Sequence, residues 1–214
     1  REMLTWCDKA YGHVQQLDEE YSDWLCIPKS VRMTSIKPSG TVSLLNGSTP
    51  GVHFPEDEYY IRRIRFSKSN TMLDTLAEAG YNIEDDKYSP NTVCVEFPVH
   101  EKYFVKGKKD VSMWEQLEIA AQYQHYWADN SVSITVTFKP DEAAQIQSAL
   151  EMYETRLKAV SFLKYEETGY EQAPYEPITK ELYEQLSANI KPITRFESVS
   201  GTGTKYCDGE SCEI

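Results

Sequence analysis

The chain has 214 residues, a mass of 24.6 kDa and an acidic balance, with 34 Asp and Glu against 22 Lys and Arg for a formal net charge of −12. A surface with this charge argues against nonspecific binding to nucleic acid or to a membrane, so we expect neither partner. No apolar run approaches the roughly 18 residues of a transmembrane helix, no signal peptide is visible, and the cysteines are sparse, which together indicate a cytoplasmic protein.

The first segment shows helical spacing from its first turn, with apolar or aromatic side chains at Leu4, Cys7, Tyr11, Val14, Leu17 and Tyr21. This pattern predicts a helix that ends before Pro28, because proline cannot continue it. No capping residue precedes the pattern and Arg1 is not an initiator, so we expect the chain to be a piece of a longer protein. Residues 30–36 then predict a short buried strand.

The next segment predicts a strand, a helix and a second strand. Residues 59–66 and residues 92–97 both have the composition and alternation of strands. Between them, Thr71 with Asp74 three residues later predicts a capped helix start. Gly80 predicts the end of that helix.

Helices and strands alternate in the second half of the chain. Ser112 with Glu115 predicts a capping box for a helix that runs through Trp127. Residues 131–138 alternate strictly between apolar and hydroxyl side chains, which predicts a strand. The remaining expected elements are a helix from Pro140, a strand over 159–163 and a helix between Thr179 and Pro192. Strands separated by helices indicate βα units, the α/β class and a largely parallel sheet or barrel.

A turn rich in small residues follows the first expected strand, and its sequence is Pro38-Ser39-Gly40-Thr41-Val42-Ser43. Unpaired backbone N–H groups at the start of a helix attract an anion, and Gly40 lets the backbone approach it closely. The turn lacks the Gly-Lys-Ser/Thr ending of a Walker A loop. From the residues alone, it is either a phosphate-binding loop or an ordinary capped turn.

Three arginines, Arg62, Arg63 and Arg65, stand out in so acidic a chain and fall within the strand expected over residues 59–66. A guanidinium pairs readily with phosphate, so this cluster is a candidate site for an anionic ligand. A solvated edge strand is the alternative, and the sequence does not choose between the two.

The end of the chain carries two of its five cysteines, Cys207 and Cys212. Asp208-Gly209 between them is a turn signal that can bring the thiols to disulfide distance, and residues 200–205 form a small, polar tether. A dithiol on a flexible tether indicates an electron shuttle. The alternatives are an inert terminus and a metal site, but two thiols without a histidine are half of the ligands that zinc takes, so we assign no metal ligand.

Several motifs, in order along the chain, resemble one family. Residues 37–45 and the run Thr49-Pro50-Gly51-Val52-His53 resemble the phosphate loop of ribonucleotide reductases. Three further motifs resemble the adenosylcobalamin-dependent, class II enzymes: residues 60–69, the run Trp114-Glu115-Gln116-Leu117-Glu118, and residues 126–138. With the cysteine pair at its end, the chain is most similar to the monomeric ribonucleoside-triphosphate reductases, over nearly all of its length.

The resemblance implies the C-terminal part of a ten-stranded α/β barrel over residues 1–197 and a flexible redox tail over residues 198–214. In such enzymes cobalamin starts a radical that passes to a cysteine on a finger loop, and the thiyl radical takes the ribose 3′ hydrogen. None of Cys7, Cys26 and Cys94 lies in a matching motif, so we expect small buried side chains there. The radical cysteine would lie in an N-terminal remainder of the reductase, in the same or a separate chain, and the isolated chain is expected to be inactive.

The resemblance also implies roles for particular residues. Pro38, Ser39, Gly40, Thr41, Val42 and Ser43 would hold the phosphates of a ribonucleoside triphosphate that is reduced to the 2′-deoxyribonucleotide. Cys207 and Cys212 would reduce the buried active-site disulfide after each turnover, and thioredoxin would reduce them in turn. Adenosylcobalamin would bind to segments between Thr41 and Lys102 and between Ser161 and Ser200, with individual contacts unassigned.

Two other interpretations stay open. The chain could be part of the large subunit of an iron-dependent ribonucleotide reductase, which shares the barrel and a cysteine pair at the end of the chain. It could also be a non-catalytic module that binds nucleotide or corrinoid. The absence of a radical cysteine favours such a module for the isolated chain, whereas the dithiol favours a reductase, because a binding module has no use for one.

Overall fold

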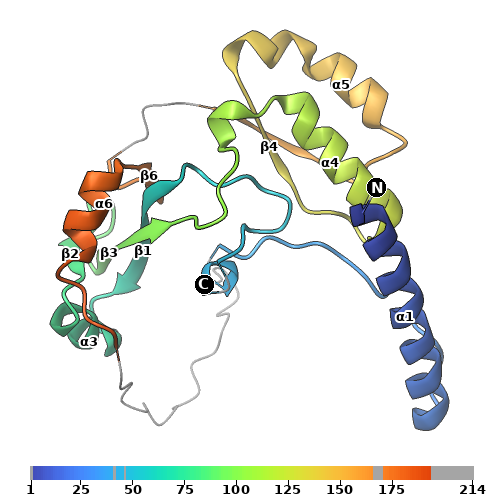
Figure 1. Cartoon of the computed structure of the whole chain (residues 1–214), viewed down its shortest axis with the longest axis horizontal. Helices are drawn as coiled ribbons and strands as arrows, with labels where there is room; N and C mark the ends of the chain where they lie inside the picture. Colours follow the sequence, from blue (N-terminus) through green and yellow to red (C-terminus); the bar gives the residue numbers. More distant parts are fainter. Residues whose placement is uncertain (1, 41, 46, 166–170, 194–214) are drawn as a thin grey trace.

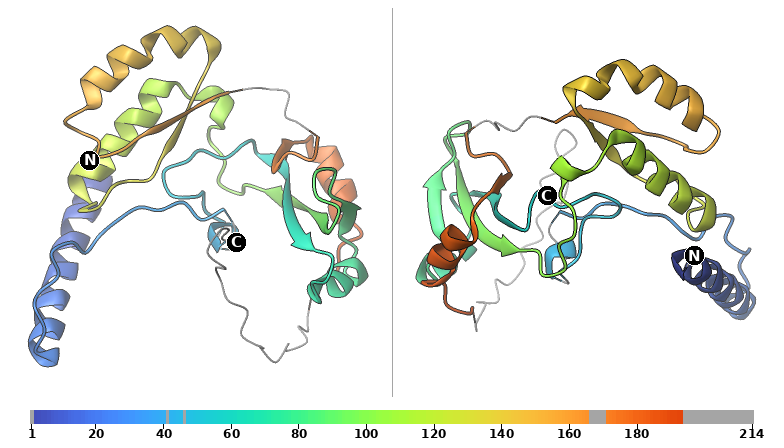
Figure 2. Two further views of the ribbon diagram at one scale, coloured as in Figure 1. Left: turned by 180° about the vertical axis from the view of Figure 1, so that it is seen from behind. Right: turned by 45° about the horizontal axis from the view of Figure 1, so that its top comes forward.

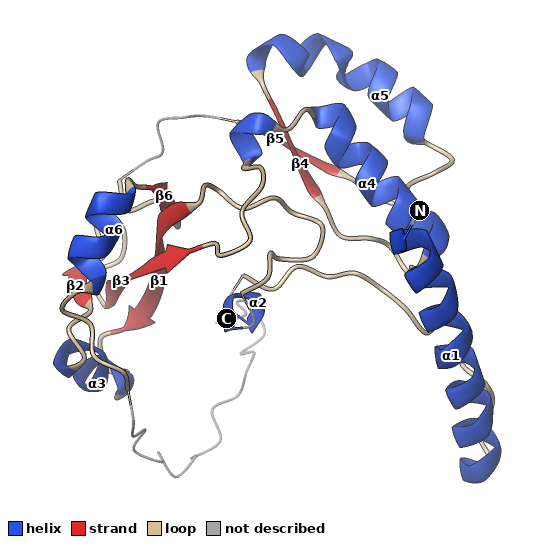
Figure 3. Cartoon of the chain, in the orientation of Figure 1, coloured by secondary structure: helices blue, strands red, loops and turns tan. Residues whose placement is uncertain are grey.

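The structure is a computed structural model that describes residues 2–40, 42–45, 47–165 and 171–193 (Figure 1). Its elements in chain order are α1 (Glu2–Leu25), α2 (Val42–Leu45), β1 (Tyr59–Ser67), α3 (Met72–Glu78), β2 (Asn82–Asp85), β3 (Thr92–His100), η1 (Lys108–Asp110), α4 (Met113–Tyr126), β4 (Thr135–Phe138), η2 (Pro140–Gln145), α5 (Ile146–Tyr153), β5 (Ser161–Lys164), β6 (Tyr175–Pro177) and α6 (Lys180–Ser187). One packed group is built on the larger sheet, and a second contains α4, α5, β4 and β5 (Figure 3). Within the described ranges, no helix is both long and apolar enough to span a membrane.

The larger sheet has the strand order β2-β3-β1-β6, and every neighbouring pair is antiparallel. β1 and β3 pair along their whole length, from Tyr59 opposite His100 to Ser67 opposite Thr92. α6 packs on these two strands, where the Tyr183 and Tyr59 ring centroids are 5.2 Å apart (Figure 2). The prediction of a largely parallel sheet is therefore wrong for these four strands. The connection between β2 and β3, residues 86–91, is a hairpin connection too short to return the chain for parallel pairing.

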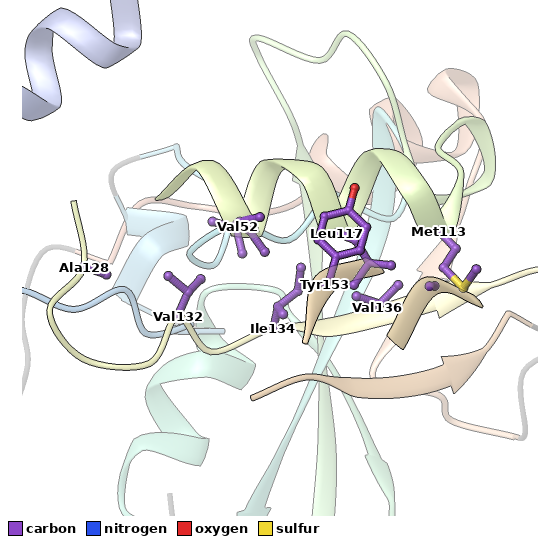
Figure 4. Close-up of a cluster of buried hydrophobic side chains, with 11 residues drawn as sticks. Val52, Met113, Leu117, Ala128, Val132, Ile134, Val136 and Tyr153 are labelled. Atoms are coloured by element: carbon purple, nitrogen blue, oxygen red, sulfur yellow. The ribbon is translucent and has the colours of Figure 1, made fainter. Parts of the chain in front are cut away.

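The second group contains the parallel pair, β4 and β5, with Thr135 opposite Ser161 and Phe138 opposite Lys164. Its core is a cluster of buried side chains (Figure 4): Val52, Met113, Leu117, Ala120, Ala121, Ala128, Val132, Ile134, Val136, Ala149 and Tyr153. Of the apolar positions within residues 131–138, Val132, Ile134 and Val136 are buried and Phe138 is partly buried. The regular strand is nevertheless shorter than the pattern, because Val132 makes only an isolated bridge to Ile36.

The starts of α4, α6 and α3 can be compared with the caps that the sequence predicted. Ser112 Oγ accepts a hydrogen bond of 3.1 Å from the Glu115 N–H, and Thr179 caps α6 in the same way, as predicted. Only this half of the predicted capping box at Ser112 is seen among the described residues, and the Glu115 carboxylate accepts from Lys106 Nζ at 2.8 Å. The predicted Thr71 cap is wrong. Thr71 has helical backbone angles and makes no capping bond, whereas the Asn70 side chain accepts from the Met72 N–H at 2.9 Å. The turn that starts α3 therefore begins one residue earlier than the pattern indicates.

The strand predicted over residues 30–36 is also wrong, apart from the single bridge at Ile36. Val31 is 94% exposed, so this segment does not have the apolar burial that a core strand needs. The Met33 N–H donates instead to the Asp129 carboxylate at 2.9 Å. A side chain thus takes the place of a strand partner for this part of the backbone.

The predicted N-terminal helix is confirmed. On its predicted apolar face, Leu4, Tyr11, Val14 and Leu17 are partly buried and Tyr21 is exposed. Cys7 and Ser22 are its buried residues, and Trp24 is 69% exposed. Cys7 and Cys94 are buried as expected, whereas Cys26 is exposed, because it follows the end of the helix with a left-handed φ of 53°. The tail proposed for residues 198–214 lies outside the described residues.

Candidate phosphate and cofactor site

Five of the six predicted phosphate-loop residues, Pro38, Ser39, Gly40, Val42 and Ser43, form the turn into α2; Thr41 lies outside the described residues. Ser39 Oγ accepts from the Val42 N–H at 3.1 Å, which caps the short helix. The Ser43 hydroxyl donates to the Ser39 carbonyl oxygen. The capped turn is therefore present. In this arrangement the Ser39 hydroxyl proton is free to point at an anion, whereas that of Ser43 must first leave the Ser39 carbonyl.

Two side chains tie this loop to the strand segment that includes β4. Lys37 Nζ donates to Ser133 Oγ at 2.8 Å. The imidazole of His53 accepts from the Thr135 N–H through Nε2 at 3.0 Å, so the proton of the neutral ring is on Nδ1, which donates to the Pro50 carbonyl at 2.8 Å. These contacts hold both ends of the loop against the core of the second group.

A cavity of about 220 Å³ lies between the loop and the larger sheet; its lining includes Pro38, Gly40, His53, Tyr60, Glu101 and Tyr175. Tyr60 Oη donates to Glu101 Oε1 at 2.7 Å, and both residues are buried. Burial raises the pKa of Tyr60, and the hydrogen bond to Glu101 raises it further. Tyr60 is therefore a hydrogen-bond donor that keeps its proton, and its bond to Glu101 satisfies one oxygen of that carboxylate.

The structure separates the three arginines of β1. Arg63 pairs with Glu96 at 2.7 Å and with Glu176, and its side chain is only 10% exposed. Arg65 pairs with Asp86 at 3.3 Å. These two guanidinium groups have carboxylate partners within the protein. They lie on β1, which is an interior strand of the sheet, so the solvated edge strand is not their setting.

Arg62 differs from its neighbours, because it pairs with no carboxylate of the described residues. Its guanidinium lies over the ring of Tyr175, 4.4 Å from the centroid. A Cβ atom built on Gly40 would lie 3.4 Å from Tyr175 Oη and 3.7 Å from Arg62 Nη2, so the loop and this stacked pair are neighbours. Tyr175 was not identified as a site residue, since it follows no motif and comes close only through pairing of β6 with β1.

The two segments expected to bind cobalamin are brought together. β1 belongs to the first and β6 to the second, and they pair from Tyr60 opposite Pro177 to Arg62 opposite Tyr175. The cavity beside them is too small to enclose a corrin, since pockets for much smaller ligands measure about 300–1,000 Å³. The part of the chain that the structure describes contains no cluster of three or more metal-ligating side chains. Cys207 and Cys212 lie outside that part.

The chain is similar over almost its whole length to proteins named adenosylcobalamin-dependent ribonucleoside-triphosphate reductases. A probable enzyme of this name from Dictyostelium discoideum is 45% identical over 222 residues, which is 100% of this chain and 29% of the relative. The enzymes from Euglena gracilis and Lactobacillus leichmannii are 42% and 41% identical, with 99% and 97% of this chain covered and 30% of each relative. The chain thus spans about 30% of the length of these curated relatives. No family model matches it.

The comparison of structures agrees with the comparison of sequences. A crystal structure of a B12-dependent, class II ribonucleotide reductase superposes with a TM-score of 0.79 and 40% sequence identity, over 88% of this chain and 27% of that one. This likeness supports the predicted α/β class and its assignment to the reductase fold. Identity at this level over nearly the entire sequence, with a shared fold, shows that the chain belongs to the adenosylcobalamin-dependent, class II ribonucleotide reductase family.

Proposed function

We propose that the chain supplies the C-terminal part of a reductase that converts ribonucleoside triphosphates to 2′-deoxyribonucleoside triphosphates. The observation that carries this proposal is the 45% identity to the Dictyostelium relative, because the match covers the whole chain. The remainder of the enzyme, in the same or a separate polypeptide, supplies the radical cysteine. We place the assembled enzyme in the cytoplasm, in line with the sparse cysteines.

The loop over residues 38–43 binds the phosphates of the substrate. Support comes from the family match and from the position of the loop, with Gly40 facing a stacked arginine and tyrosine across a short gap. Backbone N–H groups and hydroxyls suit phosphate oxygens, which accept several hydrogen bonds at once. The charges of Arg62 and Lys37 nearby favour an anion over a neutral ligand.

Adenosylcobalamin binds across an open surface of this chain and the remainder of the enzyme, through residues 41–102 and 161–200. The side-by-side pairing of β1 and β6 supports a shared surface, because it joins the two segments in one sheet. When bound, this cofactor supplies the radical that starts the reaction. The residues of this chain contribute by holding the cofactor and by positioning the triphosphate; they carry no radical themselves.

Cys207 and Cys212 form a dithiol that returns electrons to the active-site disulfide after each turnover and is restored by thioredoxin. Thiol–disulfide exchange proceeds by attack of a thiolate on a disulfide sulfur, so the pair must reach both the buried disulfide and the surface of thioredoxin. Residues 200–205, which precede the pair, are small and polar, and a tether of this composition would let the pair reach both places.

The two rival interpretations are the iron-dependent large subunit and the non-catalytic binding module. An iron-dependent large subunit would account for the loop and the cysteine pair, but the relatives named above are adenosylcobalamin-dependent. A non-catalytic binding module would bind nucleotide or corrinoid without a dithiol. The cysteine pair therefore favours the reductase over the module.

The experiment is a complementation assay. The chain is mixed or fused with the N-terminal remainder, and deoxynucleotide formation is measured with ribonucleoside triphosphate, adenosylcobalamin and a dithiol. We expect activity from the assembled enzyme and none from the isolated chain. Activity of the isolated chain would contradict the division of roles, and an assembled enzyme that runs without adenosylcobalamin would favour the iron-dependent rival.

A further inference from the structure

We propose that Arg62 binds a phosphate oxygen pair of the substrate's triphosphate through the Nε–Nη2 edge of its guanidinium. The inference rests on the proposed function of the loop at residues 38–43, and it adds a residue from a different element, β1, to that site. Phosphate is also present in the nucleotide arm of cobalamin, so the experiment below separates the two sources.

The hydrogen bonds of Arg62 leave one edge of the guanidinium unused. Nη1 donates to the Arg63 carbonyl at 2.9 Å and to the Pro174 carbonyl at 3.1 Å. Nε is buried and has no hydrogen-bond partner, and Nη2 has none among the described residues. Nε–H and one N–H of Nη2 point in the same direction, which is the fork that matches two oxygens of a phosphate.

The guanidinium is held in one orientation before any ligand arrives. The two carbonyl bonds fix Nη1, and the face of the group lies on the Tyr175 ring at 4.4 Å. An unsatisfied buried donor is costly, by about 1–3 kcal/mol, and such groups are rare in native structures. A rigid fork with an unsatisfied buried donor is therefore best explained as a preorganised half of a bidentate contact.

The Nη2 end of the unused edge lies beside the phosphate loop. Nη2 would be 3.7 Å from a Cβ atom on Gly40, whose φ is not in the left-handed region, so the absent side chain leaves room between loop and guanidinium. Conformational strain does not require glycine there. A single methyl at residue 40 would make ordinary contacts of 3.4 and 3.7 Å, whereas a larger side chain would extend into the gap that a phosphate oxygen would use.

Within the described residues Arg62 has no carboxylate partner, although Glu56 and Glu101 line the neighbouring cavity. Lys108, which lies 5.4 Å from the same Tyr175 ring, pairs with Glu56 at 2.7 Å. Glu101 accepts the Tyr60 hydroxyl. Neither carboxylate pairs with Arg62, so the positive charge of Arg62 stays available to an anion from outside.

The test measures equilibrium binding to the complete reductase, in which this chain is present with the N-terminal remainder. Arg62→Gln removes both the charge and the two parallel N–H donors, Arg62→Lys keeps the charge and removes the paired donors, and Arg156→Gln is the matched control. Arg156 is a partly exposed arginine that pairs with Glu118 at 2.8 Å and lies outside both segments proposed to bind cobalamin. The ligands are a ribonucleoside triphosphate, its diphosphate, the unphosphorylated nucleoside and adenosylcobalamin, each titrated separately.

We expect Arg62→Gln to weaken triphosphate binding by about tenfold or more, as the loss of a charge-assisted hydrogen bond predicts. Arg62→Lys should recover part of this loss, and the binding of nucleoside and cobalamin should be unchanged. Triphosphate binding by Arg62→Gln equal to that of Arg156→Gln would overturn the inference. So would a loss confined to cobalamin, or an equal loss for the nucleoside, which would mean that Arg62 is only structural.

Gly40→Val distinguishes failure of this inference from failure of the proposed function. If Gly40→Val weakens triphosphate binding while Arg62→Gln does not, the loop binds phosphate and the role of Arg62 is wrong. If neither variant changes triphosphate binding, the phosphates lie elsewhere and both proposals are wrong.

Discussion

Tyr60 and Glu101 are joined by a hydrogen bond of 2.7 Å, and both side chains are buried in the wall of the cavity beside the phosphate loop. Tyr60 lies near the start of β1, and Glu101 directly follows β3. Because these strands are antiparallel neighbours, the bond links the same end of the pair. The pKa of Tyr60 is raised, chiefly by burial and then by this carboxylate, so the hydroxyl remains a donor at all physiological pH values.

The first prediction concerns a variant that lacks the Tyr60 hydroxyl. Tyr60→Phe keeps the ring but leaves a buried carboxylate oxygen without its partner, so we expect the free energy of unfolding to fall by about 1–3 kcal/mol. Urea unfolding of the chain measures the change. Tyr103→Phe is the control, because it deletes the same atom from a ring that is 78% exposed. Equal stability of the two variants would contradict a structural role for the Tyr60–Glu101 bond.

A second prediction concerns the glycine that ends α3. Gly80 has a φ of +92°, and a Cβ atom there would lie 2.6 Å from the Asn189 carbonyl oxygen. Gly80→Ala should therefore destabilise the chain by about 1–3 kcal/mol, through backbone strain and a backbone clash. Gly12→Ala, in α1 with no atom within 4 Å of the new Cβ, should instead stabilise it by about 0.5–1 kcal/mol. Melting temperatures that shift in the same direction for both variants would disprove this account.

The third prediction is a pH dependence. Arg156 donates to both oxygens of Glu118, at 2.8 and 2.9 Å, and lowers the pKa of that carboxyl from 4.5 to about 2. A lowered folded-state pKa stabilises the protein above 4.5, and this contribution disappears as the pH falls from 4.5 to about 2. Both side chains are about 40% exposed, so solvent screening limits the effect to about 0.5–1 kcal/mol.

The corresponding variant is Arg156→Gln. Its deficit in unfolding free energy should be present at about pH 6 and much smaller at about pH 2.5, as measured by urea unfolding. In a Glu118→Gln background, the same change should cost an equal amount at both pH values. A deficit of constant size with Glu118 intact would show that Arg156 acts by packing and not through charge.

Local signals in the sequence predicted the features that depend on neighbouring residues. Ser112 is three positions from the N–H that it caps, and the apolar residues around Val136 alternate within one short run. β2 was missed because three of its four residues are polar and exposed, and the single apolar residue, Ile83, is too little to form an alternating pattern. Without β2 in the expected element order, the hairpin that makes the sheet antiparallel could not be inferred.

The candidate site likewise has one part that the sequence predicted and one part that it did not. The loop around Gly40 was predicted from a contiguous motif, which a single sequence displays directly. The residues around the loop were not predicted. Tyr175 reaches Gly40, and Glu101 reaches Tyr60, only through strand pairing between distant parts of the chain. The sequence could not decide the role of Arg62 either, since the absence of a carboxylate partner is a property of the folded sheet.

A fourth prediction tests the loop by steric obstruction. In the complete reductase, Gly40→Val should raise the Michaelis constant for triphosphate, equivalent to about 2 kcal/mol or more of binding, because its methyl groups would fill the gap to Tyr175 and Arg62. Gly40→Ala should have a smaller effect, since its single methyl fits at 3.4 Å from Tyr175 Oη. An unchanged Michaelis constant for Gly40→Val would mean that the phosphates bind elsewhere.

The fifth prediction concerns the cysteine pair at the end of the chain. Replacing Cys207 and Cys212 with Ser in the complete reductase should abolish multiple turnover supported by thioredoxin, because serine cannot carry out thiol–disulfide exchange. A single turnover should survive, since it uses electrons already stored in the buried active-site pair. Rapid-quench measurement of deoxynucleotide per enzyme separates the first turnover from those that follow.

Two further conditions make this test specific to electron relay. A small dithiol can diffuse into the barrel unaided, so activity supported by such a reagent should be largely retained in the double variant. Cys26→Ser is the matched control, because it removes a thiol that is exposed but has no proposed redox role. If the double variant turns over on thioredoxin as fast as the Cys26→Ser control, the pair is an inert terminus and electrons reach the active site by another route.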